Sequence, residues 1–451
     1  MTDSRPIPTS EYTPWRAVKF YIPLVIQSMS QSFTYPLVAA VVAHGAYQAA
    51  GLAAFSQGLT MMFVIGAIGG GLLTTGMVFG RDAEGFRQFK RLNYMVTAAL
   101  ILLQGGACLP GVERVIFQNI LGLAPPLDAV ARQTLLYSIP LQLLFFLRTP
   151  PLVALYNARA SAAANWATLF RIALTGALVP LFIRWGGVGH LWGLVAMTIP
   201  VALELALTTL FARPYIRGLG LAEDVPHATV HKQLFFTIPI SFGGLMMAVS
   251  GLMVGAFIMR AKDSAQMLAI HCIVMGVINS VSFAAIRMQA VVLAFPLYDR
   301  RAKSIFRFAL VAGGALTLLP LAGLLPAVAR WYFGTVQNLP PADVSLAIRA
   351  MLLVAALPVI QAIRGHAEGL AAYLKRPNAI LAGQAVYLAA MVCALFVGLN
   401  VGVPGYLMGI AAVWVATLLS LFTVRMGLVW AEIEDEIGGP APPRGQRPTE
   451  G

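Results

Sequence analysis

Residues 357–375 read LPVIQAIRGHAEGLAAYLK, and they decide the fold class because they combine an apolar helix with charge. The stretch lies inside a long apolar run, yet it carries Arg364, His366 and Glu368. At about 100° per residue, Gln361, Arg364 and Glu368 fall on one face of a helix. Charged side chains at membrane depth are costly, so they usually line a water-filled cavity. The stretch predicts either a functional site or a buried Arg–Glu pair that ties helices together.

A second face of the same helix is built for close packing. Gly365 and Gly369 form a GxxxG pair there. Small residues at this spacing let two helix backbones approach closely in a membrane. We therefore predict that another helix packs against this face.

The composition of the whole chain places this stretch in a membrane protein. Of 451 residues, 59% are hydrophobic and 11% are charged, and the mean hydropathy is +0.78. Soluble globular domains carry about 25% charged residues. The apolar runs are about 20 residues long, which indicates membrane helices, since a membrane barrel would show alternating segments of about 10 residues. We predict an all-α polytopic membrane protein.

Twelve membrane spans are predicted by breaking the chain at charged and Pro- or Gly-rich gaps. Their expected ranges are 17–43, 49–79, 92–112, 130–156, 163–183, 190–212, 234–259, 265–298, 305–331, 346–373, 379–400 and 404–429. The second and eighth exceed the bilayer thickness, so we expect them to tilt, bend or project. The expected organisation is a cytoplasmic segment (1–16), a six-helix bundle (17–212), a cytoplasmic linker (213–233), a second six-helix bundle (234–429) and a disordered cytoplasmic tail (430–451).

The distribution of positive charge predicts the orientation. With both termini inside, the cytoplasmic segments hold twenty Lys/Arg and the external loops hold seven. Cytoplasmic loops of membrane proteins collect Lys and Arg, so we expect both termini in the cytoplasm and the chain in a bacterial inner (plasma) membrane. The same rule accounts for much of the net charge of +13, which therefore does not indicate a nucleic-acid partner.

The chain also repeats itself weakly, at a period near 216 residues. Phe20-Tyr-Ile-Pro23 opens the first span, and Phe236-Thr-Ile-Pro239 opens the seventh. Arg148 in the fourth span and Arg364 in the tenth each follow an apolar-Pro pair and precede a tyrosine. An even number of helices per repeat keeps both halves in the same orientation. We expect two pseudo-symmetric six-helix bundles related by an axis along the membrane normal.

Charges inside the spans favour an anionic substrate. They are Arg148, Arg171, Arg287 and Arg364 against Glu204 and Glu368, which leaves the membrane domain net positive by two charges. Guanidinium groups suit carboxylate and phosphate oxygens. We predict a central basic cavity whose substrate-binding residues are Arg287, Arg364, His366, Glu368, Gln361, Asn279 and Arg148.

Three of these span residues carry separate predictions. Arg171 lies close enough to its expected helix start for its side chain to reach the cytoplasmic interface. Arg148 precedes Pro150-Pro151, which should break the helix and free carbonyls that the arginine could satisfy. Glu204 is a candidate for coupling transport to H⁺ or Na⁺, and equally a neutral, hydrogen-bonded residue facing another helix.

The sequence contains little that would indicate an enzyme or a cofactor-binding protein. The chain has no Walker loop, GxSxG elbow or HExxH motif. Its three cysteines lie in different apolar runs, which argues against a disulfide framework or a cysteine metal site. We expect no enzymatic activity, no cofactor and no metal, and we expect a monomer. A membrane enzyme that uses His366 or His271 is the minor alternative.

Several short segments are similar to those of one known family. They are Phe257–Arg260, Ala285–Arg287 onward to Phe295–Asp299, Ile363–His366 with Leu374-Lys375, Lys19–Leu24 and Gly76–Phe79. With the 6+6 arrangement, they make the chain resemble the progressive ankylosis (ANK) family of the multidrug/oligosaccharidyl-lipid/polysaccharide (MOP) exporter superfamily. The resemblance implies a MATE-like exporter of pyrophosphate, nucleotides or small carboxylates such as citrate. It also assigns Arg287, Arg364 and His366 to the anion path.

Two other transporter classes stay open at this point. A cation-coupled multidrug extruder of the MATE kind would need carboxylates in the cavity, and only Glu204 and Glu368 are candidates. A lipid-linked precursor flippase would need a wide basic cavity open sideways to lipid. The leading prediction is an alternating-access secondary transporter in the lipid bilayer that exports small anions.

Overall fold

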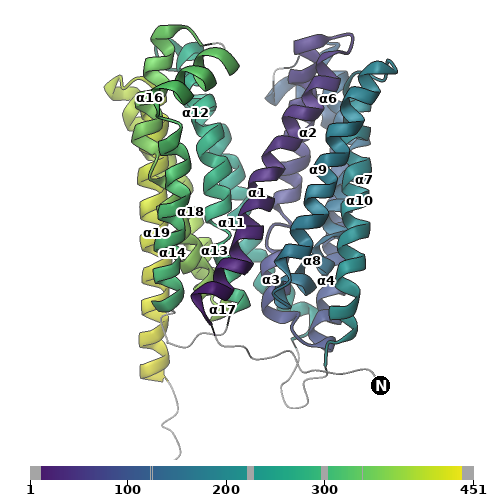
Figure 1. The fold of residues 1–451 in the computed structure, drawn as a ribbon, viewed down its shortest axis with the longest axis vertical. Helices are drawn as coiled ribbons and strands as arrows, with labels where there is room; N and C mark the ends of the chain where they lie inside the picture. The colour runs from purple at the N-terminus through teal and green to yellow at the C-terminus, as the bar shows by residue number, and fades with distance from the viewer. Residues whose placement is uncertain are drawn as a thin grey trace, which may run out of the picture.

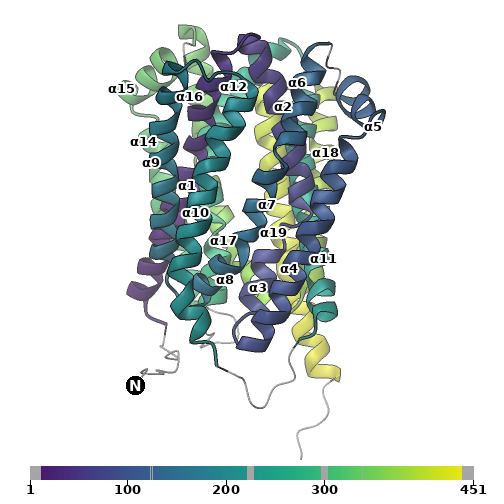
Figure 2. The same ribbon diagram turned by 90° about the vertical axis from the view of Figure 1, so that its right-hand side faces the viewer.

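The computed structural model describes residues 12–121, 123, 125–220, 228–295, 303–337 and 339–438. These residues form helices without any strand, and the helices stand in two groups side by side (Figure 1). The predicted all-α class is thereby confirmed. We call α1–α10 the N-lobe and α11–α19 the C-lobe. The beginning of α1 and the end of α19 lie at the same end of the molecule, here named the terminal side, and the opposite end is the far side (Figures 1 and 2).

The helices of the N-lobe are α1 (Pro14–Ala43), α2 (Gln48–Ala67), α3 (Leu72–Phe79), α4 (Ala83–Ala107), α5 (Val112–Arg114), η1 (Val115–Ile120), α6 (Leu127–Tyr137), α7 (Ile139–Leu147), α8 (Thr149–Asn157), α9 (Ser161–Arg184) and α10 (His190–Arg217). Those of the C-lobe are α11 (Val230–Ile258), α12 (Ser264–Ala285), α13 (Met288–Ala294), α14 (Lys303–Ala322), α15 (Pro326–Ala329), η2 (Arg330–Val336), α16 (Pro341–Val354), α17 (Leu357–Tyr373), α18 (Pro377–Val401) and α19 (Gly405–Gly438).

Side-chain caps fix where several terminal-side helices begin. Thr13 accepts a hydrogen bond from the Arg16 amide at the start of α1, and Asp82 accepts one from the Gly85 amide, at 2.8 Å, at the start of α4. Such caps satisfy backbone donors that lack a partner in the first helical turn.

The long apolar helices account for ten or eleven of the twelve predicted spans. Over the described residues, ten helical segments are long and apolar enough to cross a membrane, or eleven if the bent segment after Ala83 counts as one span. α1, with 30 residues, is also long enough. The chain is therefore an integral membrane protein. Both overlong spans are interrupted, between α2 and α3 and between α12 and α13.

Two boundaries differ from the expected organisation. The predicted linker 213–233 is shorter than expected, because α10 runs to Arg217 and α11 begins at Val230. The predicted tail begins as helix, because α19 continues to Gly438. In both places the helical hydrogen bonding extends past the apolar run that defined the predicted span. The middle of the linker, the rest of the tail and most of the N-terminal segment lie outside the described residues.

The internal repeat is visible in the backbone. Arg159 and Lys375, 216 residues apart, both adopt left-handed backbone conformations, with φ of 58° and 57°. Gly186 and Gly402, at the same offset, have φ of 75° and 77°. Positive φ is uncommon for residues other than glycine. The recurrence of positive φ at the offset expected from the sequence supports two structurally similar halves of the chain.

The lobes share a hydrophobic core only on the terminal side, as far as the described residues go. There, Phe20 and Phe79 of the N-lobe pack in one buried cluster with Phe236 and Phe295 from the C-lobe half of the chain. Toward the far side, the buried residues divide into one cluster within the N-lobe and another within the C-lobe. The helices accordingly converge at the terminal side and diverge toward the far side (Figure 1).

The GxxxG face of α17 lies against the interruption between α12 and α13. A Cβ atom at Gly365 would stand 2.6 Å from the carbonyl oxygen of Ile286, and one at Gly369 would stand 2.9 Å from the Cβ of Val292. The predicted close packing is therefore confirmed, and its partner is the broken eighth span.

Candidate functional site

A buried ion cluster forms the centre of the N-lobe. Glu204, on α10, is fully buried, and its Oε2 accepts hydrogen bonds from Arg148 Nη1 and, at 3.2 Å, from Arg171 Nη1. Its Oε1 accepts a hydrogen bond of 2.5 Å from Thr168 Oγ1. One carboxylate thus forms ion pairs with two guanidinium groups. With all three groups ionised, the cluster carries one net positive charge.

The break between α7 and α8 gives Arg148 its place. α7 ends at Leu147, and α8 begins at Thr149 with Pro150 in its first turn, where a missing N–H does no harm. The helix break predicted from the prolines is confirmed. The predicted partner of Arg148 is wrong, because its side chain binds Glu204 rather than the carbonyls near the break.

The prediction for Arg171 is also wrong. α9 begins at Ser161, so Arg171 lies almost three turns inside the helix and cannot reach the interface. Its side chain is 4% exposed and binds Glu204 and, at 3.4 Å, Thr34 Oγ1. Arg171 is therefore a site residue that the sequence analysis had placed elsewhere.

A chain of hydrogen bonds extends the cluster toward α1 and α8. Tyr156 donates to Gln27 Oε1 at 2.7 Å, and Gln27 Nε2 donates to Thr168 Oγ1 at 3.0 Å. Thr168 in turn donates to Glu204. These three uncharged residues were absent from the sequence-based set, because a single polar residue in an apolar helix carries no signal of its own partner.

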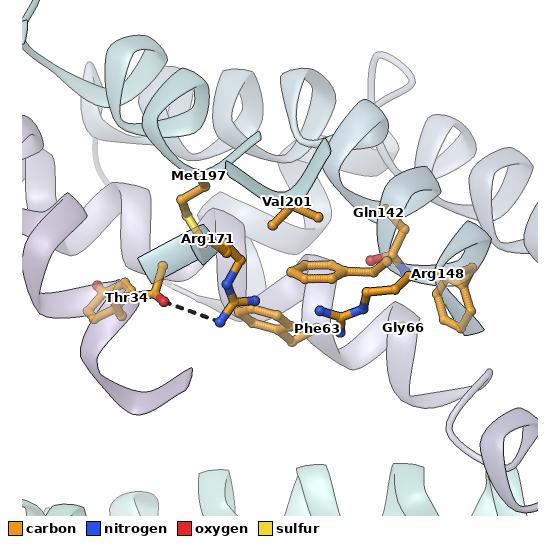
Figure 3. A pocket seen from close by; sticks show the side chains of 11 residues that line it. Thr34, Phe63, Gly66, Gln142, Arg148, Arg171, Met197 and Val201 are labelled. Atoms are coloured by element: carbon orange, nitrogen blue, oxygen red, sulfur yellow. Dashed lines mark hydrogen bonds between the residues drawn. The ribbon is translucent and has the colours of Figure 1, made fainter. Parts of the chain in front are cut away.

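A cavity of about 420 Å³ opens beside the two arginines (Figure 3). It is lined by Thr34, Tyr35, Phe63, Gly66, Gln142, Phe145, Phe146, Arg148, Arg171, Met197 and Val201, from α1, α2, α7, α9, α10 and the α7–α8 junction. Glu204 is not among these lining residues. The cavity therefore meets the arginines and lies away from the carboxylate that pairs with them.

The charged stretch of α17 forms a second buried cluster, within the C-lobe. Arg364 Nε donates to Glu368 Oε1 at 2.8 Å, and Arg364 Nη2 donates to Gln384 Oε1 at 2.6 Å. Gln384 closes the triangle by donating to Glu368 at 2.9 Å, and the ring of Tyr387 lies 5.1 Å from the guanidinium. Arg364 is 1% exposed. In this conformation Arg364 and Glu368 are a closed pair, which is the second of the two possibilities that the sequence of this stretch predicted.

The remaining predicted residues lie at several places in the C-lobe and at the contact between the lobes. Arg287 Nε donates to Ser28 Oγ at 3.1 Å across the lobe interface. His366 is buried and packs edge-to-face on Phe306, with ring centroids 5.4 Å apart. Gln361 is buried on α17, and Asn279 is partly buried on α12. The predicted set is thus divided between the N-lobe, the C-lobe and the contact between them.

The two ion clusters correspond to each other under the repeat. At an offset of 216 residues, the matched positions are Arg148 and Arg364, Thr168 and Gln384, Arg171 and Tyr387, Glu204 and Ser420, and Thr34 and Ser250. The second N-lobe arginine is replaced by a tyrosine in the C-lobe. The described C-lobe cluster therefore holds one arginine and one glutamate and is neutral, whereas the N-lobe cluster is positive.

The arrangement of two such lobes is the fold of the MATE transporters of the MOP superfamily. The chain superposes on the eukaryotic MATE transporter AtDTX14 with a TM-score of 0.71 at 14% identity, over 92% of this chain and 95% of that one. A point mutant of the Vibrio cholerae MATE transporter VcmN gives a TM-score of 0.73 at 14% identity, over 93% and 97% of the two chains.

A third similar structure is a MOP-superfamily transporter from Pyrococcus furiosus, with a TM-score of 0.69 at 14% identity over 96% of this chain and 99% of that one. That protein is described as having a binding pocket of reverse polarity, which suggests a different function for it. No protein-family model matches the chain, and no curated protein matches it. The resemblance to the progressive ankylosis family stays a prediction.

Proposed function

We propose that this chain is an alternating-access secondary transporter that binds an anion at Arg148 and Arg171. One observation carries the proposal: both arginines line the N-lobe cavity while sharing a single carboxylate behind it. The fold supports it, because the similar structures are transporters built from the same two lobes.

Electrostatics favours an anion over a cation in this cavity. A buried charge without a counter-charge is costly, and Glu204 balances only one of the two arginines. An entering anion would neutralise the second arginine through charge-assisted hydrogen bonds. A cationic drug would meet two guanidinium groups with no carboxylate among the described lining residues. The N-lobe cavity therefore supports an anion transporter better than a MATE-type extruder of cations.

Glu204 is the residue through which we propose that transport couples to an ion. Both of its oxygens bind hydrogen-bond donors, from the two arginines and from Thr168. Protonation of Glu204 would weaken its hold on both guanidinium groups and raise the net charge offered to an anion. H⁺ is thus the proposed coupling ion.

The closed side of the molecule gives the proposed direction of access. The lobes are held together at the terminal side and separate toward the far side. With both termini in the cytoplasm, as the Lys/Arg distribution predicts, this conformation faces outward. The transporter would then act in a bacterial inner membrane as a monomer, and the family resemblance proposes pyrophosphate, nucleotides and citrate as the first substrates to test.

The test is anion binding and uptake by the purified protein and by one matched pair of variants. Ligands that prefer the folded state raise the melting temperature. We expect organic anions to raise it in the wild type, and Arg171→Gln to remove that shift together with anion uptake in proteoliposomes. Arg184→Gln, which changes an exposed arginine at the end of the same helix, is the control. Equal anion shifts in wild type and Arg171→Gln would refute the proposal.

A further inference from the structure

The side-chain nitrogen donors in the lining of the N-lobe cavity belong to Arg148, Arg171 and Gln142. Arg148 Nε, Arg171 Nε and Gln142 Nε2 are buried donors without a hydrogen-bond partner among the described residues, and all three belong to lining residues. The Gln142 amide packs directly on Gly66, because a Cβ atom there would stand 2.9 Å from Gln142 Nε2. Buried donors without partners are rare in proteins, so these three side chains favour a ligand that brings hydrogen-bond acceptors into the cavity.

The remaining wall of the cavity is apolar and rich in aromatic rings. It consists of Tyr35, Phe63, Phe145, Phe146, Met197 and Val201. Phe63 and Phe145 lie with ring centroids 6.5 Å apart, and half of the Phe63 surface is exposed. Such rings gain most by covering an apolar ligand, since burial of apolar surface is the main source of affinity in pockets of this kind.

From these two walls we infer that the preferred substrate is an amphiphilic monocarboxylate, with one carboxylate head and an aliphatic or aromatic body. This inference rests on the proposed function of the cavity as an anion site. The pairing of Glu204 with both arginines shows that these guanidinium groups accept a carboxylate between them. The head of the substrate lies at the side chains of Arg148, Arg171 and Gln142 that line the cavity, and its body lies along the phenylalanines.

The same walls disfavour compact polyanions. Citrate and pyrophosphate carry charged oxygens on several sides. In the cavity, most of these oxygens would lose their hydrating water and contact phenylalanine, methionine and valine side chains instead. A buried charge without a donor is strongly unfavourable. The lining of the cavity therefore favours amphiphilic monocarboxylates over the polyanions that the sequence resemblance suggested.

The experiment measures binding of a series of straight-chain carboxylates, from butanoate to dodecanoate, to the full chain in lipid nanodiscs. Empty nanodiscs correct for partition into lipid. Each added methylene should strengthen binding about fourfold until the cavity is filled. Citrate, pyrophosphate and the amine of the same length as the best carboxylate complete the panel.

Variants separate the head contacts from the body contacts. Phe63→Ala should weaken decanoate binding at least tenfold and leave butanoate binding unchanged. Phe170→Ala is the control, because Phe170 is an exposed ring on α9 outside the cavity lining. Arg171→Gln should weaken both carboxylates alike.

The outcomes distinguish the two proposals. A chain-length dependence that Phe63→Ala abolishes supports the inference. Tighter binding of citrate or pyrophosphate than of any straight-chain carboxylate overturns it and leaves the anion site intact. Unchanged binding of every anion by Arg171→Gln, or equal binding of the amine, overturns the anion site and the inference together.

Discussion

Two symmetric contacts hold the lobes together at the terminal side. The guanidinium of Arg159 lies 4.8 Å from the ring centroid of Phe295, and the ammonium of Lys375 lies 5.4 Å from that of Phe79. Both the cations and the rings are related by the 216-residue offset, so each half of the chain places its left-handed basic residue on a phenylalanine of the other half. Arg159 Nε also donates to the Ala294 carbonyl, at 2.9 Å, at the end of α13.

Replacing both cations with glutamine should shift the protein toward the conformation that is open on the terminal side. Each cation–π contact contributes about 0.5–1 kcal/mol at a partly exposed site, and the hydrogen bond from the charged Arg159 adds about 1.5 kcal/mol. Part of this is offset, because burial and the positive charges of Arg16 and Arg81 lower the pKa of Arg159 and disfavour its charged form there. We expect a net change of about 2 kcal/mol, or roughly thirtyfold in the ratio of the two conformations.

The measurement is a distance between spin labels on the terminal ends of the lobes. Arg87→Cys on α4 and Val429→Cys on α19 are exposed positions for the labels, introduced after the three native cysteines have been replaced. In Arg159→Gln/Lys375→Gln the longer distance should gain population at the expense of the shorter one. Lys19→Gln is the matched control, since it removes a cation–π contact with Trp15 that lies within α1. An unchanged distance distribution in the folded double variant would refute the reasoning.

Three further predictions concern the ion clusters and the α17 packing. Glu204→Gln leaves both N-lobe arginines without their counter-charge, so it should lower the stability by about 3 kcal/mol and enlarge the thermal shift caused by an added anion; an equal or smaller shift would contradict this. Arg364→Met leaves Glu368 buried without a partner, so it should cost about 3–5 kcal/mol in thermal unfolding and leave the anion-induced shift intact, and a lost shift in a stable variant would restore Arg364 to the site. Gly365→Ala should destabilise by about 1–3 kcal/mol because its Cβ would meet the Ile286 backbone, whereas Gly251→Ala, with open space beside it, should be neutral or stabilising.

Local patterns in the sequence were sufficient for most of the fold. Long apolar runs mark the helices because each must match the bilayer thickness, and the second and eighth spans, which exceed that thickness, are both interrupted. The GxxxG pair predicted a close helix contact, and the offset between Arg148 and Arg364 predicted the repeat. All of these signals lie within one helix or compare two similar helices.

The site was harder to predict because it depends on contacts between helices. Arg148 and Glu204 lie 56 residues apart, and no periodicity within either helix indicates that they meet. Arg171 was misplaced because the true start of α9 at Ser161 puts it deeper than the apolar run suggested. The pair at Arg364 and Glu368 is visible in the sequence at the i, i+4 spacing, but only the packing of Gln384 and Tyr387 around it shows that it is closed.

Because the shared core lies at one end, the lobes act as levers with their pivot at the terminal side. α11, with 29 residues, is about 43 Å long, so a rotation of only 10° about that end moves its far tip by roughly 7 Å. Small rearrangements among Phe20, Phe79, Phe236 and Phe295 are thereby amplified into large displacements at the end where the described residues of the two lobes share no buried cluster. An antibody fragment that binds both far tips would consequently resist the rotation of the lobes with little force, because it acts far from the pivot.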